Sequence, residues 1–398
     1  IVANAMLMNK KNQETIESCM TLMHFFSYYE QLDDSFVQTL ALTTIAEMAS
    51  IYSSCIQTMC SIFCNLIKNV NIAENLMNLK ISKIVFKKFG KLIYELLEQC
   101  DLEITSEQFD IIIKELDSKE EPTANESFNL LRIIQICFQK NIKPKRQMKY
   151  TSLISFLHSY PNESLIVQCA AELLLETKKY EDDNDLLFAL LEALRANQDN
   201  KDVVSSIIIL LPKFASQKNT LNSSGTVELM LNLINIYKTD VLISSYAFEI
   251  LKGHPESYSQ AVSSLATLKD KKAILVISQN IVSYINEIDP SDCLGKVLRT
   301  IKLYNDDCDI CSYLTQVVFF CSTSDNNYET LVKFINRLST TCVKHIRNVN
   351  VCRATVGVIC NVSMTSHYIP QLIQTPQCVI MALKSHPSDV QIITASFR

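Results

Sequence analysis

Apolar residues recur three or four positions apart along nearly the whole chain, which places them on one face of an α-helix. No stretch alternates between apolar and polar residues over the length of a strand. The pattern predicts helices over residues 14–27, 35–49, 53–70, 81–100, 163–178, 185–196, 202–215, 226–238, 241–252, 271–285, 289–304, 309–322, 328–338, 350–363 and 376–385. We therefore expect an all-α protein.

The interruptions between these helices are short. The clearest loops are residues 117–122 and 216–225, and neither is long or biased enough to act as a flexible linker between domains. We therefore expect one domain over residues 1–398, with a minor break near 117–125. The chain begins without Met at Ile1 and stops inside a helical pattern at Arg398, so we expect a fragment of a longer protein.

A three-residue pattern recurs in the predicted helices. It has a first residue that is usually β-branched, a small or apolar residue four positions later, and usually an aliphatic residue after four more, which together form one stripe. The copies begin about 39 residues apart, between roughly 33 and 48, as in helical repeat proteins. Each unit is expected to bury its stripe against the next. The copies are Val37/Ala41/Ile45, Val85/Phe89/Ile93, Leu130/Ile134/Phe138, Val167/Ala171/Leu175, Val203/Ile207/Leu211, Ile243/Ala247/Leu251, Ile277/Ile281/Ile285, Ile310/Leu314/Val318, Val351/Thr355/Ile359 and Val390/Thr394.

One of these copies resembles the third helix of an armadillo repeat, whose pattern is V-x-x-x-A-x-x-A-L-x-N-L-A. The matching residues are Val351, Ile359, Asn361, Val362 and Ser363. Thr355 and Val358 stand where the family usually has Ala, and HEAT repeats would give almost the same pattern. The resemblance implies a right-handed α-solenoid of roughly ten armadillo/HEAT-like repeats, with a concave groove lined by the last helix of each repeat.

The resemblance also bears on the partner, because armadillo repeats that bind extended peptides carry an Asn near the end of the third helix. Only Asn361 retains it here. The equivalent positions hold Glu47, Glu95, Lys140, Thr177, Lys213, Gly253, Glu287 and Phe320, and the chain has no Trp. We therefore expect a partner helix or folded surface rather than an extended peptide. The residues expected to line the groove are Asn361, Lys213, Glu287, Phe320 and Thr177.

Composition agrees with a helical fold. The chain has 5 Gly, where average usage would give roughly 28, and hydrophobic residues make up 48% of it. The net charge of −5 argues against a nucleic-acid partner. No apolar run approaches the ~20 residues needed to span a bilayer. One basic cluster, Lys140, Lys143, Lys145, Arg146 and Lys149, is a solvated connector, a localisation signal or a contact with phosphate or a membrane surface.

Many of the 15 Cys lie inside apolar helical stretches, which is typical of free, buried thiols and of a reducing, cytoplasmic location. Cys308 and Cys311 form a C-x-x-C motif without a second pair or a thioredoxin-like context. Cys342, His345, Cys352 and Cys360 match no familiar zinc module. We expect neither a metal nor a cofactor.

No Walker, G-x-G-x-x-G, G-x-S-x-G or H-E-x-x-H motif occurs, and the six His are scattered singly. We therefore expect no enzyme but a scaffold for protein–protein interaction. One alternative is a regulatory or structural arm of a cytoskeletal, centriolar or ciliary assembly, or of a multidomain enzyme. Another is a helical enzyme whose site is assembled from distant residues. The aromatic clusters around Phe25 and Phe319 are core residues or exposed binding anchors.

Overall fold

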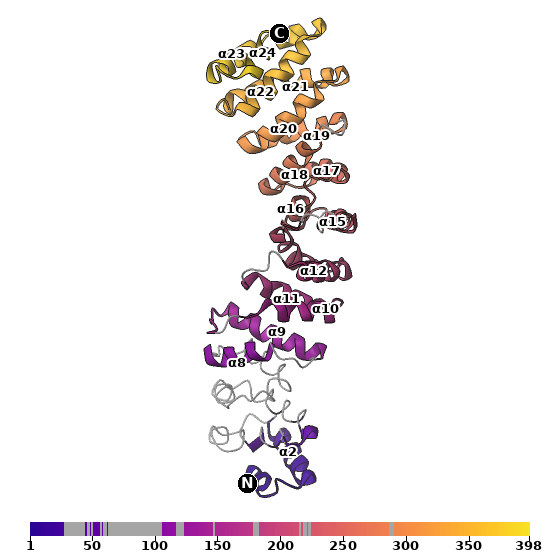
Figure 1. Ribbon diagram of the computed structural model, residues 1–398, viewed down its shortest axis with the longest axis vertical. Coiled ribbons are helices and arrows are strands. Elements are labelled where there is room, and N and C mark those ends of the chain that lie inside the picture. Colours follow the sequence, from indigo (N-terminus) through magenta and orange to yellow (C-terminus); the bar gives the residue numbers. More distant parts are fainter. Residues whose placement is uncertain are drawn as a thin grey trace. The chain divides into compact units, whose positions relative to one another are not determined.

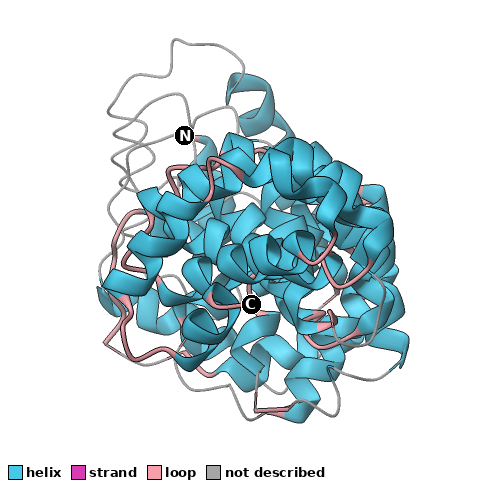
Figure 2. Ribbon diagram, turned by 90° about the horizontal axis from the view of Figure 1, so that it is seen from above, coloured by secondary structure: helices cyan, strands magenta, loops and turns pink. Residues whose placement is uncertain are grey.

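The computed structural model describes residues 1–27, 44, 45, 48, 51–55, 58, 62, 106–116, 123–145, 148–177, 183–214, 216, 217, 221, 224–285 and 290–398. Every regular element in these residues is a helix, and none of the described residues forms a strand. Figure 2 accordingly shows cyan helices joined by loops. This confirms the all-α prediction. The chain divides into two compact units, residues 1–207 and 208–398, which are described separately.

Unit 1 contains seven described α-helices that end within it, and α13 crosses its boundary. They are α1 (Val2–Met8), α2 (Gln13–Ser27), α8 (Ser106–Leu116), α9 (Ala124–Gln139), α10 (Tyr150–Ser159), α11 (Ser164–Glu176) and α12 (Asn184–Ala196), with α13 (Lys201–Ile208) and the 3-10 turn η1 (Ser53–Cys55). Between α8 and α12, α9 contacts α8 and α11, while α10 contacts α11 and α12. Each helix thus contacts its neighbour in the chain or the next helix but one.

Unit 2 continues the pattern. Its helices are α15 (Ser224–Ile236), α16 (Val241–Ile250), α17 (Tyr258–Thr267), α18 (Lys271–Ser283), α19 (Leu294–Leu303), α20 (Cys308–Cys321), α21 (Tyr328–Lys344), α22 (Val349–Ser363), α23 (Pro376–Ser385) and α24 (Val390–Ser396). Short 3-10 helices lie between some of them: η2 (Leu211–Phe214), η3 (Pro255–Ser257), η4 (Pro290–Cys293), η5 (Asp325–Asn327) and η6 (Ser366–Leu372).

The helices of unit 2 form two rows. One row runs through α16, α18, α20, α22 and α24, and each of these helices contacts the next in the row. The second row runs through α15, α17, α19, α21 and α23, and it contacts the first row helix by helix. Figure 1 shows the two helices of each pair beside one another in unit 2. The core of the unit lies between the rows.

Most of the repeated stripe is buried, as the sequence predicts. In the copies that begin in α16, α18 and α20, all three positions are at most 6% exposed. The stripe fails at its third position in α11, where Leu175 is 37% exposed, and at α24, where Val390 is 73% exposed and Ile392 is fully buried in its place. The predicted register of the last copy is therefore wrong by two positions, which turns Val390 away from the contact between α24 and α22.

Some predicted boundaries also change. The helix predicted over 202–215 ends as α13 at Ile208, and a 3-10 turn follows around Pro212, which has no backbone N–H to continue a helix. The helix predicted over 289–304 begins with the 3-10 turn η4 before α19. Conversely, the helix predicted over 328–338 continues as α21 to Lys344.

Polar side chains join helices about one repeat apart. His345 and His386, at the ends of α21 and α23, donate from Nε2 to the carbonyls of Asn305 and Ile346 at 2.8 Å, each across 40 residues. Tyr284 donates its hydroxyl to the carbonyl of Leu251 at 2.7 Å, across 33 residues. Polar contacts thus recur at the spacing of the sequence pattern. The single array over residues 1–398 stays a prediction, and its minor break near 117–125 lies mostly outside the described residues.

Candidate protein-binding groove

A groove of about 580 Å³ is formed by α20, α22 and α24, three successive helices of one row in Figure 1. Helix α20 contributes Gln316, Phe319 and Phe320. Helix α22 contributes more lining residues than either neighbour, and residues from Val390 to Arg398 form the other side. All three helices belong to unit 2, so the groove is complete within one unit.

The α-helical period explains how α22 builds the wall. Asn350, Ala354, Gly357 and Asn361 follow one another at steps of four, three and four residues, so they lie on one face of the helix. The adjacent face carries Val351 and Thr355, which are at most 1% exposed and belong to the core. One helix thus serves the core and the groove with different faces.

An aromatic pair forms the apolar part of the groove. Phe319 and Phe320 meet edge to face with ring centroids 5.7 Å apart, and both are half-buried. A Cβ atom on Gly357 would lie 2.5 Å from Cε2 of Phe319. The absence of a side chain at Gly357 therefore allows the Phe319 ring to rest directly on α22.

Amide side chains supply hydrogen-bonding groups around this apolar part. Asn361 donates from Nδ2 to the hydroxyl of Ser322 at 2.9 Å, which fixes the direction of its side chain. No hydrogen bond from the described residues reaches Oδ1 of Asn361. Gln391 of α24 is exposed on the opposite side of the groove. The groove thus offers amides to a partner beside aromatic rings.

The charge of the groove comes from arginines. Arg353 donates from Nε to Oδ2 of Asp389 at 2.8 Å, and Asp389 accepts the backbone N–H of Ile392 to cap α24. The hydrogen bond from Arg353 is the main reason that the pKa of Asp389 is lowered. Arg398 adds a second cation, and no Asp, Glu or His is among the lining residues.

The structure brings together two of the five residues predicted to line a groove. Phe320 and Asn361 both face this one. Lys213 is exposed in the 3-10 turn η2 and is not part of the lining. Thr177 belongs to unit 1, where it caps the end of α11 and donates its hydroxyl to the carbonyl of Leu174 at 2.9 Å. Glu287 lies outside the described residues.

Sequence reasoning missed Gln316, Arg353, Gly357 and Gln391. A signal was present for two of them, since Gln316 precedes Phe320 by four residues, and Gly357 precedes Asn361 by four residues. Extending the face that contains each predicted residue by one helical turn would have found both. The contribution of Gln391 depends on how α24 lies against α22, and the misassigned register of α24 concealed it.

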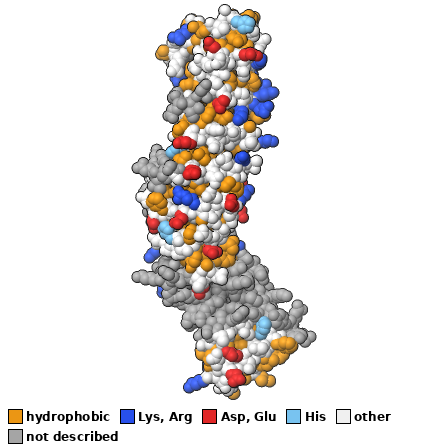
Figure 3. All heavy atoms as spheres, turned by 90° about the vertical axis from the view of Figure 1, so that its right-hand side faces the viewer, with side chains coloured by type: hydrophobic (Ala, Val, Ile, Leu, Met, Phe, Trp, Pro, Cys, Tyr) orange, Lys and Arg blue, Asp and Glu red, His pale blue; other side chains and the backbone are white. Residues whose placement is uncertain are grey.

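The other candidate sites have structural explanations. His345 bonds to a backbone carbonyl rather than joining Cys342, and Cys360 lines the groove. The described residues contain no group of three His, Cys, Asp or Glu side chains suited to a metal ion. Phe25 of α2 is exposed, and Figure 3 shows apolar side chains among both acidic and basic ones on one face.

Comparison of the sequence with protein-family models found no match, and comparison with curated proteins found none either. In the part of the chain that the structure describes, no helix has both the length and the apolar character to cross a membrane.

Proposed function

We propose that this protein is a non-enzymatic scaffold whose groove over α20, α22 and α24 binds a helix of a partner protein. The groove itself is the observation that carries the proposal, because it joins Phe320 and Asn361 with an aromatic pair, amides and arginines. The proposed architecture is a right-handed α-solenoid of roughly ten armadillo/HEAT-like repeats. The two rows of helices in unit 2 and the polar contacts at repeat spacing support it.

The lining indicates the chemistry of the partner. Aromatic rings that line a groove suit apolar side chains at positions i, i+3 or i+4, and i+7 of a helix. Arg398, with no acidic residue among the lining residues, favours a carboxylate on the same partner helix, and the N–H groups of Arg353 that do not bond to Asp389 are further donors to it. The proposed ligand is therefore an amphipathic helix with at least one Asp or Glu beside its apolar face.

One further observation supports binding rather than catalysis, and a second supports a reducing, cytoplasmic location. Acid–base catalysis needs a group of suitable pKa beside the reacting atoms, and the lining of this groove contributes neither a carboxylate nor an imidazole. The described cysteines are free thiols, mostly buried in helices, as in proteins of a reducing compartment.

A displayed library of random 16-residue peptides, selected for binding to the full chain, tests the proposal. The expected binders carry the apolar helical spacing and an acidic residue. Their affinity for the Phe320→Ala variant should be at least ~10-fold lower than for the parent chain. Phe334→Ala on α21, in the other row, is the matched control, because Phe334 is also half-buried but is not part of the lining.

Circular dichroism must first show that both variants retain the helical content of the parent chain. Binders with no apolar helical spacing, or binders equally weakened by the two substitutions, would contradict the groove as the binding site. Replacing the acidic residue of a selected peptide by its amide should weaken binding to the parent chain. The same replacement should weaken binding to the Arg353→Gln variant less.

A further inference from the structure

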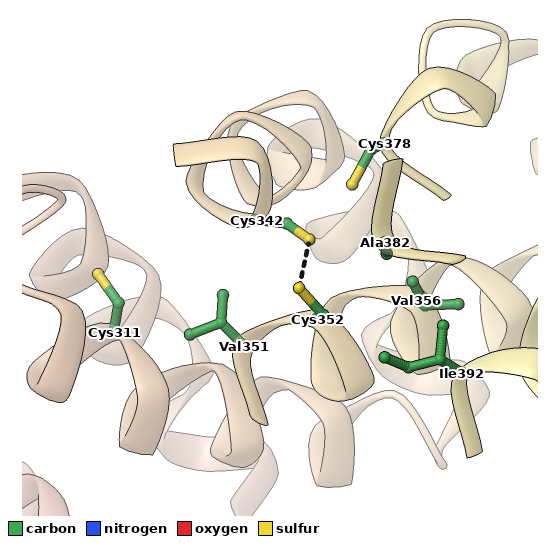
Figure 4. Close-up of a cluster of buried hydrophobic side chains, with 8 residues drawn as sticks. All are labelled: Cys311, Cys342, Val351, Cys352, Val356, Cys378, Ala382 and Ile392. Atoms are coloured by element: carbon green, nitrogen blue, oxygen red, sulfur yellow. Dashed lines mark hydrogen bonds between the residues drawn. The ribbon is translucent and has the colours of Figure 1, made fainter. Parts of the chain in front are cut away.

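Three thiols meet between the last helices of unit 2. Cys342 of α21, Cys352 of α22 and Cys378 of α23 are each at most 2% exposed and belong to one buried cluster. The Sγ atoms of Cys342 and Cys352 are 3.7 Å apart. Figure 4 shows these two thiols pointing at one another, with the sulfur of Cys378 on the far side of Cys342.

Among the described residues, three buried thiols have a lowered pKa, namely Cys293, Cys352 and Cys378. Burial raises the pKa of Cys137, Cys169 and Cys311 to about 12, which leaves them protonated and unreactive at neutral pH. The hydrogen bond donated by Cys342, with a smaller contribution from His386, lowers the pKa of Cys352 to about 7. The pKa of Cys342 is raised, chiefly by its hydrogen bonds with Cys352 and Cys378, so Cys342 keeps its proton.

We propose that Cys342 and Cys352 are a site of reversible oxidation, at which a small hydroperoxide such as hydrogen peroxide joins them in a disulfide. The Cys352 thiolate attacks one peroxide oxygen, the O–O bond breaks, and the products are a sulfenic acid and hydroxide. Oxidation of Cys352 removes the thiolate that accepts the hydrogen bond of Cys342. The proton of Cys342 then passes to the sulfenic oxygen while the sulfur of Cys342 attacks the sulfenic sulfur, so the S–S bond forms, the S–O bond breaks and water leaves. The two thiols lose two electrons, and the peroxide is reduced to two water molecules in total.

The buried position of the two thiols limits the size of the oxidant that reaches them and determines which helices the disulfide would join. Two fully buried thiols are closed to a large disulfide such as oxidised glutathione, so a water-sized oxidant must enter during local opening of the structure. The sulfur atoms must approach from 3.7 Å to about 2.05 Å to form the bond. The bond would join α21 to α22, the central helix of the groove. This inference does not depend on the proposed function.

The experiment treats the full chain with hydrogen peroxide at pH 7.5, then with N-ethylmaleimide in denaturant, and maps the digested peptides by mass spectrometry. The expected product is a Cys342–Cys352 disulfide peptide that dithiothreitol reverses, formed at least ~5-fold more slowly at pH 5.5, where less of Cys352 is thiolate. Oxidised glutathione should form far less of it than peroxide does.

Matched variants separate this pair from the rest of the cluster. Cys378→Ser and Cys311→Ser should retain the disulfide, while Cys352→Ser should leave Cys342 reduced. The wild-type peptide map decides the matter without any variant. A Cys342–Cys378 bond as the main product, sulfinic acid at Cys352, or a reduced pair after the half-buried Cys19 and Cys308 have oxidised would each overturn the proposal.

Discussion

Gly357 determines how closely Phe319 approaches α22, since a Cβ atom there would lie 2.5 Å from the ring. Gly357→Ala should push the ring into the groove. We expect a cost of roughly 1 kcal/mol in the free energy of unfolding, because overpacking by about 1–3 kcal/mol outweighs the gain in helix propensity. Affinity for a groove-binding helical peptide should fall as well. Urea denaturation and peptide titration measure the two effects.

Gly295 in α19 provides the control, because a Cβ atom there would meet nothing within 4 Å. Gly295→Ala should leave the free energy of unfolding unchanged or raise it, and should not affect the groove. Equal effects from the two substitutions would show that Gly357 has no special contact with Phe319.

The ion pair of Arg353 and Asp389 should make stability depend on pH at its acidic end. The pKa of Asp389 is lowered from its ordinary value of 3.8 in the folded protein. The stabilisation is therefore present above pH 3.8 and is lost as the pH falls through the lower folded pKa. Asp389→Asn, which retains a capping oxygen, should cost about 0.5–1 kcal/mol at pH 7 and progressively less as the pH falls below 3.8. Urea denaturation at several pH values measures this, and a pH-independent difference would contradict it.

At this scale, the sequence predicted part of the groove. Phe320 and Asn361 were found because each occupies a position that the armadillo pattern marks. Gly357 was not found, because its role depends on a ring that is 38 residues away in the sequence. The contact of Cys342 with Cys352 was not predicted either, because it depends on how α21 packs against α22, whereas Cys342 and His345 are only one helical turn apart at the end of α21.

At the scale of the helix, N-cap residues explain where the helices of one row in unit 2 begin. Each helix of that row begins after an Asp or Asn whose side chain accepts a backbone N–H of the first turn. These residues are Asp240, Asp270, Asp307, Asn348 and Asp389. They recur once per helix pair and form a second periodic signal, independent of the apolar stripe.

Asp270 tests the value of such a cap, since its carboxylate accepts from the N–H groups of Lys272 and Ala273 at 2.9 and 3.0 Å. Asp270→Ala should lower the free energy of unfolding by about 1 kcal/mol, whereas Asp270→Asn should recover most of that loss. Urea denaturation of both variants makes the comparison. If Asn proved as costly as Ala, the charge of Asp270 rather than its capping bond would be the stabilising feature.

The elements themselves were predictable because a helix depends on local pattern. Helix α23 has the predicted bounds, α22 begins one residue earlier than predicted, and α20 differs by one residue at each end. The errors occurred where a local rule was overlooked, as at Pro212, or where two helices meet. The register of α24 was wrong because Val390 and Ile392 are equally apolar, and only contact with α22 distinguishes them.

For the molecule as a whole, the decisive question is whether stability is shared among neighbouring helices or throughout the chain. Leu314 of α20 is fully buried, and α20 contacts α18, α19 and α22. Leu314→Ala should cost about 2–5 kcal/mol through the cavity it creates. In a repeat array, where each unit contacts only its neighbours, that cost should be local. Amide hydrogen exchange should therefore accelerate in α18–α22 while α9–α11 keep the rates of the parent chain. Equal acceleration in both regions would mean that one cooperative core extends through the chain, and the repeat architecture proposed above would be wrong.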